Sequence, residues 1–411
     1  MLTNDTIIDK YFKKKYKNIS SSVTLYNLNR EIQEFSYINN EYFTTSCYDS
    51  GYSIDVLSNN DCYTESNFEY GSKKENLNNF KSYKEKILWF VNEIEKIKGV
   101  IKVNYAKLNY IDKIKIMNSK EDIVQDFRIC TVNRIDLFVK NKNSYKFLTY
   151  SVSDNLDNEY LRIKREINQF LFNDININNL DYSEYPILFD KGTFGVVIHE
   201  SVGHMLESDL SSSYLHEYFG KKITLNEISV FDSAKKEMPI QMKYDDEGNL
   251  YSDTTLINKG KLIGHLSSNR YRSHNILNQA NARRQCYRNI SMPRMSNTYI
   301  ANGIKTKENI INNMENGILI KNCYCGSVNP QTGDINIMVN LAYLIKNGII
   351  QSSLNNLIAY GNGMEILGNI NQIGNDLTFN VGLCIKKGQK IIISTGSPTV
   401  LLNNIKLKEL I

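Results

Sequence analysis

Clusters of turn-forming residues divide the second half of the chain into short apolar stretches. Each cluster contains glycine beside asparagine, aspartate, lysine or glutamine, and glycine, asparagine and aspartate supply the backbone conformations of tight turns. Short apolar stretches between such clusters are typical of β-strands. The clusters are DDEGN (245–249), NKGK (258–261), PQTGD (330–334), KNGII (346–350) and KKGQK (386–390). This pattern predicts a β-rich fold for residues 181–411, with one buried helix that is described below.

Residues 1–180 mix helical and strand-like patterns. Apolar residues recur near the helical period from Asn76 to Lys98 and from Leu156 to Leu171, and Asp5 to Lys17 predicts an opening helix. Strand-like alternation occurs at 21–28, 34–39, 51–58, 102–111 and 127–140. Because 411 residues are many for a single core, we predict an α+β protein with two domains. A mixed α/β domain would span 1–180 and a β-rich domain 181–411.

Charge and composition argue against several classes of function. The net charge of +5 is spread along the chain, with no basic block interleaved with aromatic residues, so we predict no nucleic-acid partner. No apolar run approaches the roughly 18 residues that cross a bilayer, and the first 17 residues lack the apolar core of a signal peptide. The odd count of seven cysteines indicates reduced thiols rather than a disulfide framework. These features predict a cytoplasmic protein with no membrane partner.

Two of the five histidines lie in the segment GVVIHESVGHMLESD (195–209), beside a glutamate. His199 and His204 are five residues apart, and Glu200 follows the first of them. On a regular helix this spacing leaves two side chains about 140° apart, too far for both to bind one ion. A single π-turn, or a helix break at Gly203, would bring the two rings together. We therefore predict that the imidazoles converge only because this helix is irregular.

The same segment predicts where the helix begins and what chemistry it carries. Thr193 or Asp190 is expected to cap a helix that starts near Phe194. Converging imidazoles would bind zinc, and a catalytic zinc site needs three protein ligands, with water in the fourth position. A carboxylate beside the metal can accept the proton of that water, so Glu200 is the candidate general base. Glu207 either orients the imidazole of His204 or is an exposed residue at the helix end.

The residues themselves do not identify the third ligand. The remaining histidines sit among polar, loop-like residues and are predicted to be surface or packing residues: His216, His265 and His274. Cys323 and Cys325 resemble half of a metal site but lack a matching second pair. Cys384 ends a strand-like run just before a glycine turn, where a thiolate can point into a cleft. Composition alone does not choose among these candidates.

IHESVGHMLE (198–207) resembles the helix of the TldD/PmbA family of intracellular metallopeptidases, whose active members carry a His-Glu-x-x-x-His motif. The similarity runs from about Asp190 to Asn404. Its further blocks, in order, are ARRQCY (282–287), MPRMSNTY (292–299), AYLIKNG (342–348), NQIGNDL (371–377), GLCIKKGQ (382–389) and SPTVLLNN (397–404).

This resemblance implies a zinc-dependent peptidase. It implies that His199, His204 and Cys384 bind Zn²⁺ and that Glu200 is the catalytic base for the metal-activated water. It also implies a TldD-like subunit, which would pair with a TldE (PmbA-like) subunit or with itself. Members of the family are thought to cleave unfolded or extended peptides inside a closed dimer.

The sequence leaves two other readings open and departs from the family at several positions. A non-catalytic peptide-binding or assembly subunit would keep the motif without turnover, and an older family label suggests regulation of a DNA enzyme. The family usually has glycines near 324–326 and a Gly-Lys pair where this chain has Ile385 and Lys386, and residues 393–396 also differ. We expect these departures to alter peptide preference and to leave the metal-binding residues unaffected.

Overall fold

The computed structural model describes most of the chain. The described residues are 22–57, 62–71, 81–118, 120, 122–141, 144–172, 182, 185–210, 213–224, 226–271, 280–354 and 356–409. The predicted opening helix at 5–17 and His274 lie outside these ranges.

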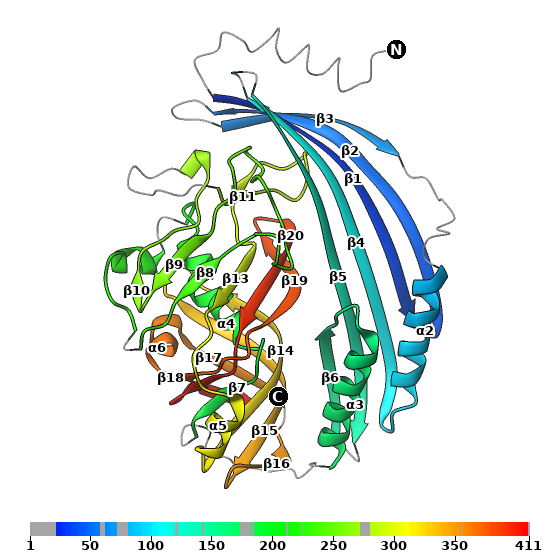
Figure 1. The fold of residues 1–411 in the computed structure, drawn as a ribbon, viewed down its shortest axis with the longest axis vertical. Helices are drawn as coiled ribbons and strands as arrows, with labels where there is room; N and C mark the ends of the chain where they lie inside the picture. Colours follow the sequence, from blue (N-terminus) through cyan, green and yellow to red (C-terminus); the bar gives the residue numbers. More distant parts are fainter. Residues whose placement is uncertain are drawn as a thin grey trace.

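The N-terminal part is built on a long antiparallel sheet (Figure 1). Within the described ranges its strand order is β3-β2-β1-β4-β5-β6. The strands are β1 (Ser22–Ile38), β2 (Glu41–Leu57), β3 (Cys62–Gly71), β4 (Val100–Asn118), β5 (Ile123–Asn141) and β6 (Ser144–Ser151). Two predicted strands, 21–28 and 34–39, are parts of the single strand β1. The polar residues between them do not end the strand, because Arg30 forms an ion pair at 2.7 Å with Asp112 of the neighbouring strand β4. A charged residue thus continues the strand instead of ending it.

Two amphipathic helices cover one end of this sheet, as the sequence predicts (Figure 1). They are α2 (Lys81–Glu95) and α3 (Leu156–Phe172). Their apolar residues recur at helical spacing and are buried against the strands, where such an apolar stripe is stabilised by leaving water. The buried residues include Ile87, Phe90 and Ile94 of α2 and Ile163, Ile167 and Phe170 of α3.

The C-terminal part contains two larger sheets, which bears out the predicted α+β class. Among the described residues one sheet has the order β10-β9-β8-β13-β20-β19, and the other has the order β18-β21-β7-β14-β15-β17-β22. The first consists of β10 (Lys261–Leu262), β9 (Thr254–Asn258), β8 (Val230–Asp232), β13 (Asn297–Ile300), β20 (Gln389–Ser397) and β19 (Thr378–Lys386). The second consists of β18 (Ile370–Ile373), β21 (Val400–Leu402), β7 (Ile187–Phe189), β14 (Asn316–Val328), β15 (Asp334–Lys346), β17 (Leu357–Asn362) and β22 (Lys406–Glu409); β16 (Ile349–Ser353) pairs with β15.

The helix of the histidine motif, α4 (Gly195–Ile198), lies between these two sheets. It contacts β13 and β20 on one side and β14 and β15 on the other. Its residues Val197 and Ile198 are fully buried. The expectation of a single helix here is wrong, because the described residues also form the short helices α5 (Lys307–Asn312) and α6 (Gly363–Gly368).

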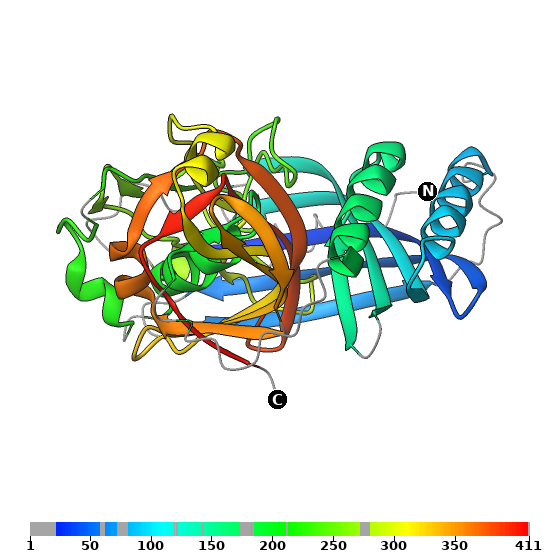
Figure 2. The same cartoon turned by 90° about the horizontal axis from the view of Figure 1, so that it is seen from below.

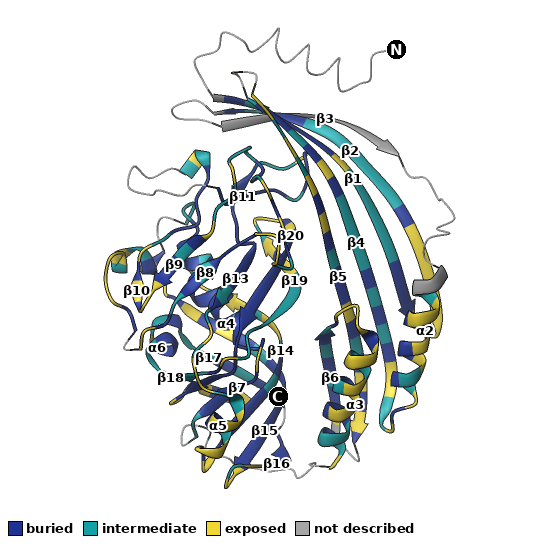
Figure 3. Cartoon of the chain, in the orientation of Figure 1, coloured by how far each residue is buried: buried dark blue, intermediate teal, exposed yellow. Residues whose placement is uncertain are grey.

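The N-terminal sheet packs directly on the C-terminal part. Ile163 and Ile167 of α3 share one hydrophobic cluster with Leu319 of β14 and Tyr343 of β15. In Figure 3, buried residues alternate with less buried ones along β4 and β5, because successive side chains of a strand point to opposite faces. The shared cluster means that each part buries apolar side chains of the other. The predicted domain boundary near residue 180 stays a prediction.

Polar contacts add to this packing at both ends of the N-terminal sheet. Near β6, the side-chain amide of Asn340 in β15 donates to the carbonyl of Phe147 at 2.8 Å. At the other end, Arg128 pairs with Asp246 at 2.7 Å, and Arg284 pairs with Asp55 of β2. The small sheet of β11 (Ala282–Arg283) and β12 (Met292–Pro293) lies beside Arg284. These contacts hold the long strands over one side of the C-terminal part.

Figure 2 shows the C-terminal strands, coloured yellow to red, gathered at one end of the molecule, while the long strands run past them to α2 and α3. None of the helices in the described ranges is both long and apolar enough to cross a membrane.

Candidate metal centre

The helix of the histidine motif is irregular, as predicted. After α4 it continues as a π-turn at His199–Gly203 and then as a 3₁₀ turn at His204–Leu206. The backbone N–H of His204 donates to the carbonyl of His199, five residues back, instead of the usual four. Consequently the two imidazole rings lie 4.7 Å apart between centroids. Of the two distortions considered, the structure contains the π-turn.

Gly203 has a different role from the predicted one. Its dihedral angles, φ −57° and ψ −64°, are helical, so the chain does not break there. A Cβ atom at this position would lie 1.9 Å from Sδ of Met295, far inside van der Waals contact. The absence of a side chain at Gly203 therefore lets the side chain of Met295, in the segment between β12 and β13, pack closely against the helix.

Replacing Gly203 by alanine is expected to lower the free energy of unfolding by about 1–3 kcal/mol, the usual cost of overpacking a core. Urea denaturation measures this change. Gly368→Ala is the matched control, because a Cβ atom there would meet nothing within 4 Å. Equal stabilities of the two variants would contradict the packing role of Gly203.

Neither predicted residue caps the helix. The helix begins at Gly195 after Phe194, which makes no side-chain capping hydrogen bond. Asp190 instead forms ion pairs with Lys307 and Lys321. The hydroxyl of Thr193 donates to the carbonyl of Asp190 at 2.5 Å. Asp190 is thus used to join α5 and β14 to the start of the motif segment.

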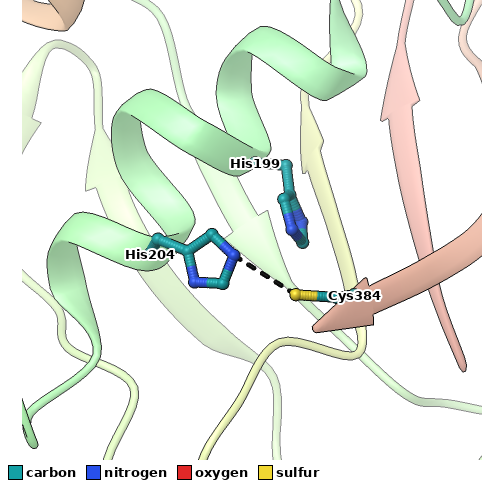
Figure 4. A group of neighbouring side chains, drawn as sticks. All are labelled: His199, His204 and Cys384. Carbon is teal, nitrogen blue, oxygen red and sulfur yellow. Dashed lines mark hydrogen bonds between the residues drawn. The ribbon is translucent and has the colours of Figure 1, made fainter. Parts of the chain in front are cut away.

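Cys384 approaches the two histidines from β19, the strand at one edge of its sheet. Its Sγ lies 3.2 Å from Nε2 of His204 (Figure 4). One donor atom from each of His199, His204 and Cys384 lies within 4.8 Å of the others. The described part of the chain contains no other such group of three histidine, cysteine or carboxylate donors. The structure therefore brings together the three residues that the family resemblance implied.

The electrostatics of this group favour a cation. Burial opposes ionisation of Cys384, but hydrogen bonds and charge from His199 and His204 bring the pKa of its thiol down to about 4. Burial alone would lower the pKa of His204, but Glu207 and Cys384 raise it well above its usual value. Without a metal, a thiolate therefore lies beside a protonated imidazole, and a metal cation can replace that proton.

These donors fit zinc in kind and in spacing. Thiolate sulfur and imidazole nitrogen are the ligands that zinc prefers. Two ligand atoms of a tetrahedral zinc ion lie about 3.5 Å apart, given bond lengths of about 2.0–2.3 Å. The observed 3.2 Å between Cys384 and His204 is close to that separation. Nδ1 of His199 is buried and has no hydrogen-bond partner, so it is available as a ligand.

Glu200 lies on the π-turn, next to His199, and borders the same cleft as the three donors. Its side chain packs on β14 at Gly326, where an added Cβ atom would come within 2.8 Å of Cγ of Glu200. Burial raises the pKa of the Glu200 carboxyl group, although the two histidines lower it. The carboxyl group thus lies beside the donor cluster, in a largely desolvated position.

Glu207 is buried and not exposed at the helix end. Its Oε2 lies 2.8 Å from Nδ1 of His204, and its side chain is 0% exposed. Burial would raise the pKa of Glu207, but His204, Lys386 and Arg294 bring it down to about 2. Of the two readings left open by the sequence, the contact with the imidazole is the one observed.

Two cations that the sequence did not predict as part of the site lie behind this cluster. Lys386 lies 2.9 Å from Glu207, and the fully buried Arg294 donates to the carbonyl of Cys384 at 3.0 Å. Arg294 stands between a proline and a methionine in MPRM, and a charge inside an apolar block is a signal of a buried ion pair. Lys386 corresponds to the lysine of the family's Gly-Lys pair, so the departure at this pair is Ile385. Lys386 is linked to His204 through Glu207, and the expected effect of the departures on peptide preference stays a prediction.

A cleft of about 1680 Å³ opens in front of the donors. The N-terminal part lines one wall with residues of β5, β6 and α3, and the C-terminal part lines the other with β14 and β19. Two departures from the family border the same space: Ile385 is 61% exposed and Tyr324 is 42% exposed. In β14 the pairing with β15 shifts between Cys323 and Cys325, and such bulges redirect side chains next to functional sites.

The remaining candidates lie apart from the cluster. The rings of His216 and His265 stack with 4.6 Å between their centroids, and the ring of Phe219 also stacks on His265, at 4.7 Å. Both histidines are therefore packing residues, as predicted. Burial lowers the pKa of His265 to about 4, which keeps its ring neutral. Cys323 and Cys325 both border the cleft but do not join the three donors.

Comparison with known proteins identifies relatives of the C-terminal part. Residues 182–409 match the family model of the PmbA/TldA metallopeptidase C-terminal domain. A metalloprotease TldD homolog of Buchnera aphidicola is 31% identical over 230 residues, which are 54% of this chain and 48% of the relative. A zinc metalloprotease TldD homolog of Saccharolobus solfataricus is 27% identical over 230 residues, 54% of this chain and 51% of the relative. The chain thus spans about half the length of the curated relatives it matches.

The fold as a whole also has a solved counterpart. The crystal structure of TldE from Thermococcus kodakarensis superposes with a TM-score of 0.77 over 97% of this chain and 98% of that chain. The two sequences are only 16% identical, so this likeness concerns the fold alone.

Proposed function

The chain belongs to the PmbA/TldD family of metallopeptidases, and we propose that it is a zinc-dependent peptidase that hydrolyses unfolded or extended peptides. The observation that carries this proposal is the convergence of His199, His204 and Cys384, with Glu200 beside them, at the wall of a large cleft. Two imidazoles and a thiolate leave a position open for water and substrate, which distinguishes a catalytic zinc site from a structural one.

In this proposal each residue has a defined task. Zinc held by His199, His204 and Cys384 would act as a Lewis acid that polarises the scissile carbonyl and lowers the pKa of a water molecule. Glu200 accepts the proton of that water and later returns it to the leaving amine.

The cleft supports an extended substrate. Among the described residues β19 is the edge strand of its sheet and β7 pairs with β14 only along Ile318–Ile320, so β19 and the part of β14 that borders the cleft each lack a neighbouring strand on one side. A peptide added along such an edge is held by backbone hydrogen bonds, which accept many sequences but require an unfolded chain. We propose that the peptide lies along β19, next to Cys384.

The proposal extends to setting and partner. The described cysteines are free thiols, which supports a reducing compartment such as the cytoplasm. The fold shared with TldE supports an assembly with a TldE-like subunit or with a second copy of this chain. A subunit that only binds peptides is the competing reading.

Chelation of zinc tests the activity directly. The full chain, with and without a TldE-like partner, is incubated with an unfolded polypeptide, and cleavage is followed by mass spectrometry. We expect cleavage of the unfolded chain, loss of cleavage with a chelator, and recovery when one equivalent of zinc is returned. A folded protein of the same size is the control and should stay intact. Peptide binding without any zinc-dependent product would support the binding subunit instead.

A further inference from the structure

Two side chains of β19 contact two side chains at the end of the motif helix, in parallel. Cys384 and Lys386 are two residues apart on β19, so they project from the same face of the strand. Cys384 contacts His204 at 3.2 Å, and Lys386 contacts Glu207 at 2.9 Å. The strand therefore contacts the motif segment twice: through the proposed zinc ligands Cys384 and His204, and, two residues further along β19, through the ion pair of Lys386 and Glu207.

A single oxygen atom connects the ion pair to the imidazole. Oε2 of Glu207 lies 2.9 Å from Nζ of Lys386 and 2.8 Å from Nδ1 of His204. When Nδ1 carries the proton donated to this oxygen, Nε2 presents its lone pair on the other side of the ring. That side is where Sγ of Cys384 lies, 3.2 Å away. The position of the carboxylate thus sets the orientation of the ring.

Lys386 is itself held firmly. Besides Glu207 it contacts Asp209 and the carbonyl of Pro293, the latter at 3.4 Å. The side chain of Lys386 is 8% exposed, and those of Glu207 and Asp209 are 0% exposed. Because these groups are buried, their attractions are little weakened by water and fix a single geometry. The next residue, Lys387, also pairs with Asp209, at 2.9 Å, but its side chain is 53% exposed and points to Asp209 rather than to Glu207.

We propose that Lys386 is a positioning residue of the metal centre. Through Glu207 it holds the imidazole of His204 against Cys384, so that the donors are already assembled when zinc arrives. Ordering a ligand in advance removes the entropic cost of ordering it on binding, and partners behind metal-binding histidines typically change metal affinity by 10–100-fold. The proposal rests on the zinc site put forward above.

Zinc affinity of the full chain tests this role without any measurement of activity. Competition with a chromogenic chelator gives the affinities of wild type, Lys386→Met and Lys387→Met. We expect Lys386→Met to bind zinc about 10–100-fold more weakly than wild type. Lys387→Met, which removes a neighbouring lysine that also pairs with Asp209, should stay within about twofold of wild type. Equal affinity of Lys386→Met and wild type would overturn the proposal.

A double-mutant comparison tests whether the effect passes through Glu207. In a Glu207→Met background, adding Lys386→Met should change zinc affinity by less than about twofold, because methionine leaves no oxygen to connect Lys386 to His204. This pair also removes both charges together, so it remains informative if Lys386→Met alone does not fold. A further tenfold loss in the double variant would overturn the proposed route. If wild type itself binds no zinc, the proposed function fails, an outcome distinct from equal affinities.

Discussion

Replacing Glu200 by glutamine is expected to lower kcat for an unfolded peptide by about 10²–10⁴-fold while leaving one zinc ion bound per chain. The expected loss is that of removing a general base, because the amide cannot accept the proton of the attacking water. Glutamine has the size of glutamate, so the packing of Glu200 against Gly326 is preserved. Peptide cleavage and zinc content are measured on the same preparation.

The control for this experiment is Glu308→Gln. Glu308 is an exposed glutamate that borders the same cleft, at the start of α5. It should keep wild-type turnover. If Glu200→Gln cleaves peptides as fast as wild type does, the proposed role of Glu200 is wrong, whatever the metal content.

Cys384→Ala is expected to weaken zinc binding by roughly 10²-fold or more and to abolish peptide cleavage at limiting zinc. A complete four-ligand zinc site binds with about 10–16 kcal/mol, so a single ligand contributes about 3 kcal/mol. Chelator competition measures the affinity. Cys130→Ala is the matched control, since Cys130 is a buried cysteine on β5 outside the donor cluster. The third-ligand assignment fails if both variants hold zinc as tightly as wild type.

The local part of the site was predictable from the sequence. The five-residue spacing of His199 and His204 cannot serve one ion on a regular helix, and this conflict alone predicts the distortion that the structure contains. The failure of the predicted cap could not be foreseen, because Asp190 forms ion pairs with Lys307 and Lys321, which are more than a hundred residues away in the sequence. Capping rules consider only neighbouring residues, so they do not include such distant partners.

The third donor could not be chosen from the residues alone. Cys384 reaches His204 only because β19 pairs with β20, and β20 pairs with β13, which brings residue 384 across a sheet to the helix. Nothing in the spacing of the cysteines carries that information, and the family resemblance supplied it. The roles of Lys386 and Arg294 could not be predicted for the same reason, because these cations contact Glu207 only in the folded chain.

The fold followed the sequence where periodicity was local. The helix predicted at 156–171 is α3, at Leu156–Phe172. The long strands were read as shorter segments, because polar residues such as Arg30 interrupt the apolar alternation. Arg30 is satisfied by Asp112 and by the carbonyl of Gln285, in the segment that precedes β12. Contacts between distant segments therefore override the local signal for a strand end.

X-ray absorption at the zinc edge, on the full chain loaded with one equivalent of zinc, tests the shared metal centre most directly. We expect one sulfur at about 2.3 Å and imidazole nitrogens at about 2.0–2.1 Å around the same ion. A spectrum with only nitrogen and oxygen neighbours, and no sulfur, would contradict it.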